Sequence, residues 1–427
     1  MPTTQHTPLT SQLQSTAHAQ YAVFYAWELG AGLGHMAVFE PLAHALRERG
    51  STSLWATASP DAPAFCAARG WPHQAMPQAL QTAGITDSPP LSYGDVLLRH
   101  GFADAQHATA RVQVWIDAMV ASGARAVVAD HAPTAVLAAR ILGLPVMLLS
   151  SGFTTPPPQH PTPALRPWIA MEDGLLQKID GLVVDCINQV LAHYGKSPLA
   201  SIAQLFEVAE PTLATFPELD HYGLRAGGAY WGTPALYGQG AQLAWPVGRP
   251  SESGQPIPKI FAYLRPETEH LQAILQALSR GAFRTICYCP GLPAAQRESF
   301  ANEALVFSNE PVDLRWVSAE ADCAVGYASV ATTTAMLLAG KPMLLLPSHM
   351  EQFMLASRAL ETGAAMGVMP ETAPGDLEAA LYALTQLPDH RLRAALFAHK
   401  YAEFNSDAVV YRMALRMQAL LGATIAA

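Results

Sequence analysis

One histidine and one aspartate stand where two predicted strands end. His35 follows a short apolar strand pattern, 21–27, and a glycine-rich loop, at the start of a helical pattern. Asp130 ends another apolar strand pattern, 126–129. In a parallel sheet both positions lie at the same edge, so the two side chains can meet. A carboxylate that accepts one imidazole N–H stabilises the ring when its other nitrogen takes a proton from a hydroxyl, so this pair predicts general-base chemistry.

Each of these two residues also has a structural explanation. A histidine at a helix start often caps or packs, and Asp130 precedes Pro133 and Thr134, a usual setting for a helix cap. The helix dipole should lower the pKa of His35 and keep the ring neutral at pH 7. The chain has 15 histidines, so the pairing with Asp130 is what distinguishes His35 from the others.

Short apolar runs alternate with amphipathic helical runs along most of the chain, the pattern of parallel sheets covered by helices. One series ends near residue 149, and a second begins at residue 259. We predict an α/β fold of two Rossmann-like doubly wound domains that face a cleft. The expected divisions are a disordered tail (1–20), an N-terminal domain (21–235), a linker (236–258), a C-terminal domain (259–400) and a last helix packing back toward the first domain (401–427).

Composition excludes several classes of function. The 427 residues carry a formal net charge of −9 with no basic run, so nucleic acid is not an expected partner. No apolar stretch is long enough to span a membrane and the start of the chain has no signal-peptide pattern, so we expect a cytoplasmic protein without integral membrane association. Five scattered cysteines are expected to be structural thiols, and no metal site is expected.

The glycine-rich loop before His35 does not match a dinucleotide site. Gly30, Gly32 and Gly34 are spaced two apart, unlike the Gly-x-Gly-x-x-Gly of such sites. The next strand ends at Thr57-Ala58-Ser59, without the acidic residue that would hold a ribose. A nicotinamide enzyme is therefore disfavoured.

Four segments of the chain resemble the UDP-glycosyltransferase superfamily. They are Gly-Leu-Gly-His-Met around His35, Ala-Asp-His-Ala-Pro around Asp130, residues 212–220 and above all residues 322–367. That superfamily has two Rossmann-like domains, called the GT-B fold, and includes bacterial natural-product and macrolide glycosyltransferases of glycosyltransferase family 1. The resemblance, which spans about 20–370, implies an acceptor in the N-terminal domain and a nucleotide sugar in the C-terminal domain.

The C-terminal segment carries the more specific match and also departs from it. Its resemblance implies the donor-binding residues Tyr327, Ala328, Ser329, Thr332, Glu351 and Gln352. Small residues before a helix free backbone N–H groups for a diphosphate, and an acid–amide pair can hold sugar hydroxyls. The family's diphosphate-binding histidine is Tyr327 here, its glycine pair is Ala328-Ser329, and its ribose-binding glutamate is Ala335. Arg265 after the strand 259–264 could replace the missing positive charge, or it could be a surface arginine.

Aromatic residues in the first domain suggest an apolar or aromatic acceptor. Phe102, Trp115 and Phe153 are the candidates, although aromatic residues at such positions are often part of the core.

The sequence as a whole predicts a metal-independent, inverting glycosyltransferase that uses a UDP- or TDP-linked sugar and a small-molecule acceptor. His35 would take the acceptor's proton, Asp130 would orient the ring, and no cofactor is expected. An alternative is a degenerate, non-catalytic GT-B protein that binds a ligand or a partner, because the diphosphate motif is altered. A nucleotide-sugar epimerase would need more charged residues around the donor than the sequence offers.

Overall fold

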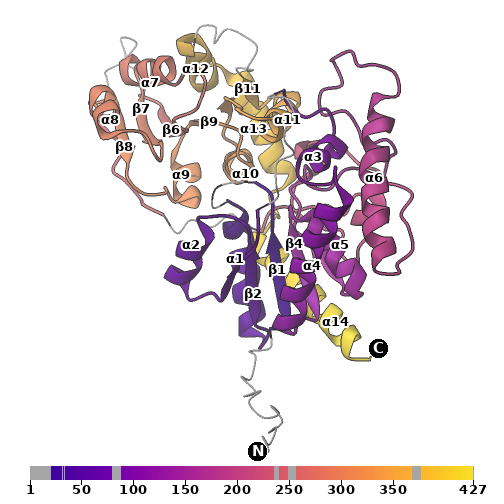
Figure 1. Ribbon diagram of the computed structural model, residues 1–427. Coiled ribbons are helices and arrows are strands. Elements are labelled where there is room, and N and C mark those ends of the chain that lie inside the picture. The colour runs from indigo at the N-terminus through magenta and orange to yellow at the C-terminus, as the bar shows by residue number, and fades with distance from the viewer. Residues whose placement is uncertain are drawn as a thin grey trace, which may run out of the picture.

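The protein consists of two parallel-sheet units (Figure 1). The computed structural model describes residues 21–30, 32, 34–78, 88–234, 240–248, 256–367 and 377–426. The predicted tail over 1–20 lies outside the described residues, as do 235–239 and 249–255 of the segment predicted as a linker. In Figure 1 the second unit, in orange, lies above the first, in indigo to magenta.

The first sheet has five parallel strands in the order β3-β2-β1-β4-β5. Its strands are β1 (Val23–Trp27), β2 (Ser53–Thr57), β3 (His73–Ala75), β4 (Ala126–Asp130) and β5 (Val146–Leu148). Helices α1 (Gly34–Glu48) and α2 (Ala62–Arg69) pack on one face. The other face is covered by α3 (Tyr93–Arg99), α4 (Ala105–Ser122), α5 (Pro133–Leu142), α6 (Leu175–His193) and the 3₁₀ turn η1 (Ile202–Phe206).

The second sheet has six parallel strands in the order β11-β10-β9-β6-β7-β8. Its strands are β6 (Lys259–Tyr263), β7 (Arg284–Tyr288), β8 (Leu305–Ser308), β9 (Cys323–Gly326), β10 (Met343–Leu345) and β11 (Ala365–Gly367). One face packs against α9 (Leu314–Glu320), α10 (Val330–Leu338), α11 (Met350–Glu361) and α13 (Pro388–Lys400). The other packs against α7 (Leu271–Arg280), α8 (Ala294–Phe300) and α12 (Leu377–Gln386). The predicted class, two doubly wound parallel α/β sheets, is confirmed.

Each sheet contains one point where the chain order reverses. In the first sheet, β1 continues through α1 on one face and its neighbour β4 continues through α5 on the other. In the second sheet, β6 and β9 are neighbours and continue through α7 and α10 on opposite faces. Connections that leave a sheet edge in opposite directions open a crevice between the strand ends, which is where ligands of such sheets bind. The fold therefore offers two binding points.

The last helix, α14 (Ser406–Ala426), packs on the first unit although it follows α13 of the second (Figure 1). Val409, Met413, Met417 and Leu421, spaced four apart, are buried in the core beside α1. This spacing places all four on one helix face, which is why the helix can cover the sheet. The chain thus crosses between the two units a second time, at residues 401–405.

The sequence patterns missed several short elements. Strands β3, β8 and β11, of three or four residues each, were not predicted, although β5 and β10, which are equally short, were. Helices α2, α3, α8 and α9 have seven or eight residues, about two turns, so their periodicity was weak. No named helix or strand lies between Leu148 and Leu175.

The packing of α14 gives a stability prediction. Met413 is fully buried, whereas Leu415 on the same helix is 45% exposed. Met413→Ala should lower the free energy of unfolding by about 2–5 kcal/mol because it leaves a cavity. Leu415→Ala, as the matched control, should change it by less than about 1 kcal/mol. Urea unfolding followed by tryptophan fluorescence measures both, and equal effects would show that α14 does not pack as described.

Candidate active site

His35 and Asp130 meet at the reversal point of the first sheet. His35 lies in the first turn of α1, and Asp130 is the last residue of β4. The His35 Nδ1 and Asp130 Oδ2 atoms are 2.9 Å apart, within hydrogen-bond distance. The indole of Trp27 stacks on the imidazole with ring centroids 4.9 Å apart. The carboxylate and the indole together fix the orientation of the ring and leave Nε2 as its second functional atom.

Gly30 leaves room for that second nitrogen. Its backbone has a φ of 103°, and a Cβ placed on it would lie 2.8 Å from Nε2 of His35. Both the left-handed backbone and the close approach require glycine. The loop that the sequence singled out for its glycines therefore shapes the space around the histidine.

The pKa of His35 is raised, not lowered as the helix dipole alone led us to expect. Burial lowers it, but the negative charge of Asp130, the hydrogen bond to that carboxylate and the charge of Glu351 together outweigh burial. The sequence argument failed because it considered only the partial charges of one helix. Two full negative charges close to the ring favour the imidazolium more strongly.

Glu351 links the two units at this site. It lies in the first turn of α11, and its Oε1 accepts a hydrogen bond of 3.4 Å from the hydroxyl of Ser151, which follows β5. Burial raises the pKa of Glu351 most, Asp130 also raises it, and His35 opposes both. Nearby, the rings of Trp168 and Phe353 pack with centroids 5.1 Å apart. The edges of the two sheets are therefore in direct contact around His35.

Arg265 and Tyr327 lie together at the reversal point of the second sheet. The Arg265 guanidinium lies 5.3 Å from the ring centroid of Tyr327 and 5.7 Å from that of Tyr263, the last residue of β6. A Cβ placed on Gly32 would lie 3.5 Å from an Arg265 nitrogen. The guanidinium therefore faces the glycine-rich loop of the first unit, and the interpretation of Arg265 as a plain surface residue does not fit this position.

The helix start after Tyr327 has free backbone donors. Ser329 precedes α10 in an extended conformation without capping it through its side chain, and Thr332 is buried in the first turn. The first N–H groups of a helix have no partner within it and attract anions. Ala328 has a φ of 61°, a left-handed conformation that glycine adopts more easily. The backbone at Ala328 is therefore one that a glycine would adopt without strain.

Gln352 has a local partner. Its side-chain oxygen accepts a hydrogen bond of 2.9 Å from the backbone N–H of Ser348. This bond holds the loop between β10 and α11, so the residue has a structural role beside the predicted sugar contact.

All three predicted acceptor residues belong to one core cluster, and two of them are completely buried. Phe102 and Trp115 have no exposed surface, and Trp115 packs edge-on against Phe24 of β1. They leave no face for an acceptor, so their assignment to the acceptor site was wrong. Phe153, which follows β5, packs against His131 with ring centroids 6.0 Å apart and lies beside the strand ends.

His131 is a residue that the sequence analysis missed. It follows Asp130 directly, its φ is 44°, and neither ring nitrogen has a hydrogen-bond partner in the described part of the chain. Burial, followed by the charges of His35 and His100, holds its pKa well below the usual value. A neutral imidazole offers one donor and one acceptor. Its position directly after Asp130 is the sequence feature that could have indicated a place in the site.

The architecture matches solved glycosyltransferases over nearly the whole chain. The calicheamicin glycosyltransferase superposes with a TM-score of 0.67 at 17% identity, covering 95% of this chain and 98% of that one. The spinosyn rhamnosyltransferase gives 0.65 at 16%, covering 92% and 99%. A glycosyltransferase of Streptomyces sp. SF2575, complexed with thymidine diphosphate, gives 0.62 at 17%, covering 91% and 98%. The chain has the GT-B fold. Its structural neighbours are natural-product glycosyltransferases with that fold.

One curated glycosyltransferase is similar to this chain in sequence, over a shorter range. The zeaxanthin glucosyltransferase of Pseudescherichia vulneris is 25% identical over 267 residues, which are 56% of this chain. The match spans 60% of the length of that curated relative. No protein-family model matches the chain.

The described residues were also compared with the requirements of a metal site and of a membrane span. Among the residues that the structure describes, no group of three or more His, Cys, Asp or Glu side chains is arranged to hold a metal ion. No described helix is both long and apolar enough to cross a membrane.

The raised pKa of His35 can be tested without a substrate. Asp130→Asn should lower the pKa of the imidazole, because it removes the nearest negative charge and weakens the hydrogen bond. Glu351→Gln should lower it less, since Glu351 contributes least among the causes. NMR titration of the His35 ring measures both shifts. An unchanged pKa in Asp130→Asn would contradict the pairing.

Proposed function

We propose that the protein is an inverting glycosyltransferase that moves a sugar from a nucleoside diphosphate to a hydroxyl of a small molecule. The observation that carries this proposal is the His35–Asp130 pair at one reversal point, with Arg265 and the start of α10 at the other. One side can take a proton and the other can stabilise a diphosphate. The close approach of Arg265 to Gly32 in the loop before His35 supports the proposal that the two sides face each other.

The proposed step is a single displacement. Nε2 of His35 takes the proton of the acceptor hydroxyl, and the oxygen forms a bond to the anomeric carbon of the sugar. The bond from that carbon to the diphosphate breaks, and the electron pair leaves with the diphosphate. Asp130 stabilises the imidazolium, and attack from the face opposite the leaving group inverts the configuration.

Groups of the second unit stabilise the negative charge of the leaving group. Arg265 supplies a guanidinium, and the first N–H groups of α10 supply backbone donors. Tyr327, held against Arg265, supplies a neutral hydroxyl. We propose this arrangement as the substitute for the histidine and glycine pair of the family, with no resident cofactor or metal.

We propose that the acceptor lies against Phe153 and His131. Phe153 keeps 5% of its surface exposed, unlike Phe102 and Trp115, and the neutral His131 has a donor and an acceptor that no described residue uses. Such a site favours an acceptor with an apolar body that carries a second polar group. The altered diphosphate motif keeps the degenerate, non-catalytic alternative open.

Replacement of His35 tests the general base. His35→Ala should lower the rate of sugar transfer by about 10²-fold or more, the usual contribution of a general base. Binding of UDP or TDP should be unchanged, because His35 belongs to the other unit. Release of UDP or TDP from a panel of nucleotide sugars, with and without candidate acceptors, measures the rate. Full turnover in His35→Ala would contradict the mechanism, and no release by the wild type from any donor would favour the degenerate alternative.

Replacement of Arg265 tests the donor side. Arg265→Ala should weaken binding of UDP or TDP about ten- to hundredfold, because a charge-assisted hydrogen bond contributes about 1.5–3 kcal/mol. Tyr327→Phe should weaken it less, since it removes only a neutral donor. Arg297→Ala, on α8 and hydrogen-bonded to Asn309, is the control that should leave binding unchanged. Calorimetric titration of each variant with UDP and TDP measures the affinities. Equal affinities in all of them would show that the diphosphate does not bind at this site.

A further inference from the structure

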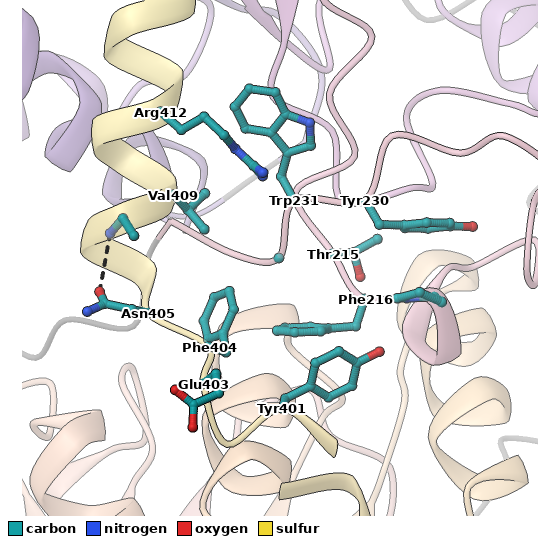
Figure 2. Close-up of a pocket in the computed structure, with 13 residues that line it drawn as sticks. Thr215, Phe216, Tyr230, Trp231, Tyr401, Glu403, Phe404, Asn405, Val409 and Arg412 are labelled. Atoms are coloured by element: carbon teal, nitrogen blue, oxygen red, sulfur yellow. Dashed lines mark hydrogen bonds between the residues drawn. The ribbon is translucent and has the colours of Figure 1, made fainter. Parts of the chain in front are cut away.

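A cavity lies away from the candidate active site, where the chain crosses from the second unit back to the first. Its volume is about 450 Å³, within the range of small-molecule sites. Residues 401–405, between α13 and α14, form one wall, and the loop 215–232 of the first unit forms another. We name it the crossing pocket, and its lining includes Thr215, Phe216, Trp231, Tyr401, Phe404 and Arg412 (Figure 2).

Five of the thirteen residues that line the crossing pocket are aromatic. Phe216 packs edge-on against Tyr401 and Phe404, with ring centroids 4.5 and 4.9 Å away. The backbone of Gly232 approaches the ring of Phe404 so closely that a Cβ there would lie 2.3 Å from it. These contacts join the two units and hold the rings in place. A rigid set of rings favours a flat aromatic ligand over a flexible chain.

One polar side chain of the pocket, Thr215, has no hydrogen-bond partner among the described residues. Thr215 is 1% exposed. In Figure 2 this side chain lies between Trp231 and Phe216. A buried hydroxyl without a partner is costly, so its presence against a cavity indicates that a ligand atom can bond to it.

Arg412 gives the pocket its charge. Its guanidinium covers the ring of Trp231 at 3.8 Å from the centroid, and among the described residues no carboxylate pairs with it. Burial lowers the pKa of Arg412, yet a guanidinium remains charged at neutral pH. The carboxylate of Glu403, also in the lining, is directed away from Arg412 in Figure 2. The pocket therefore presents a planar cation beside aromatic rings.

We propose that the crossing pocket binds a small aromatic carboxylate. The ligand's rings pack among the aromatic side chains, its carboxylate accepts a pair of hydrogen bonds from Arg412, and Thr215 donates to an oxygen of the ligand. Planar guanidinium groups match carboxylates in this two-bond geometry. The site is separate from the His35 region and does not depend on the proposed transfer reaction.

Calorimetric titration with 2-naphthoate tests the proposal on the full chain. Binding should be saturable with a Kd below about 1 mM, and the uncharged 2-naphthamide should bind at least about tenfold more weakly, as loss of a charge-assisted hydrogen bond implies. The cationic 2-naphthylmethylammonium should bind more weakly still. Saturating UDP should leave the affinity for 2-naphthoate unchanged. Absence of saturable binding, or displacement by UDP, would overturn the proposal.

Two variants locate the binding. Arg412→Ala should weaken 2-naphthoate binding about tenfold or more, whereas Arg47→Ala, which removes a guanidinium from the ring of Trp71 elsewhere, should not. Thr215→Val should also weaken binding, and it should raise Tm because it removes a buried unpaired hydroxyl. Equal binding in wild type, Arg412→Ala and Thr215→Val would overturn the proposal. The Thr215→Val result decides if Arg412→Ala does not fold.

Discussion

The hydrogen bond between His35 and Asp130 is the interaction on which the site depends. It joins the residues that follow two neighbouring strands, and it forms only because β1 and β4 are adjacent while their helices leave on opposite faces. The aspartate also changes the chemistry of the ring, since its charge and its hydrogen bond outweigh burial and raise the pKa of His35. One contact therefore positions the imidazole and makes it a stronger base.

The second sheet also has a reversal point, and the proposed reaction is therefore divided between two domains. The reversal point of the second sheet brings Arg265 after β6 beside Tyr327 after β9. Contacts such as Ser151 with Glu351 then hold the two edges together. The crossing of α14 to the first sheet ties the two domains by a further covalent connection.

The sequence predicted the elements that show a clear hydrophobic periodicity. It missed the features that depend on residues brought together only in the folded chain. The alternation of strands and helices gave both sheets, and the strand-end positions of His35 and Asp130 predicted their pairing. The pKa direction of His35 was predicted wrongly because the helix dipole was weighed alone, whereas the charge of the predicted partner Asp130 and its hydrogen bond raise the pKa most. Phe102 and Trp115 were misassigned because the sequence alone does not distinguish an aromatic residue buried in the core from one exposed at a binding site. His131 lies inside the Ala-Asp-His-Ala-Pro segment, but its burial and its unpartnered ring nitrogens become visible only in the structure.

The central claim is that the two reversal points form one site for a nucleotide sugar and its acceptor. A crystal structure of the full chain with bound TDP or UDP tests it most directly. The account predicts the diphosphate between the start of α10 and the Arg265 guanidinium, with the side that would carry the sugar directed toward Nε2 of His35. A nucleotide bound elsewhere, or one whose diphosphate contacts neither Arg265 nor α10, would contradict the account.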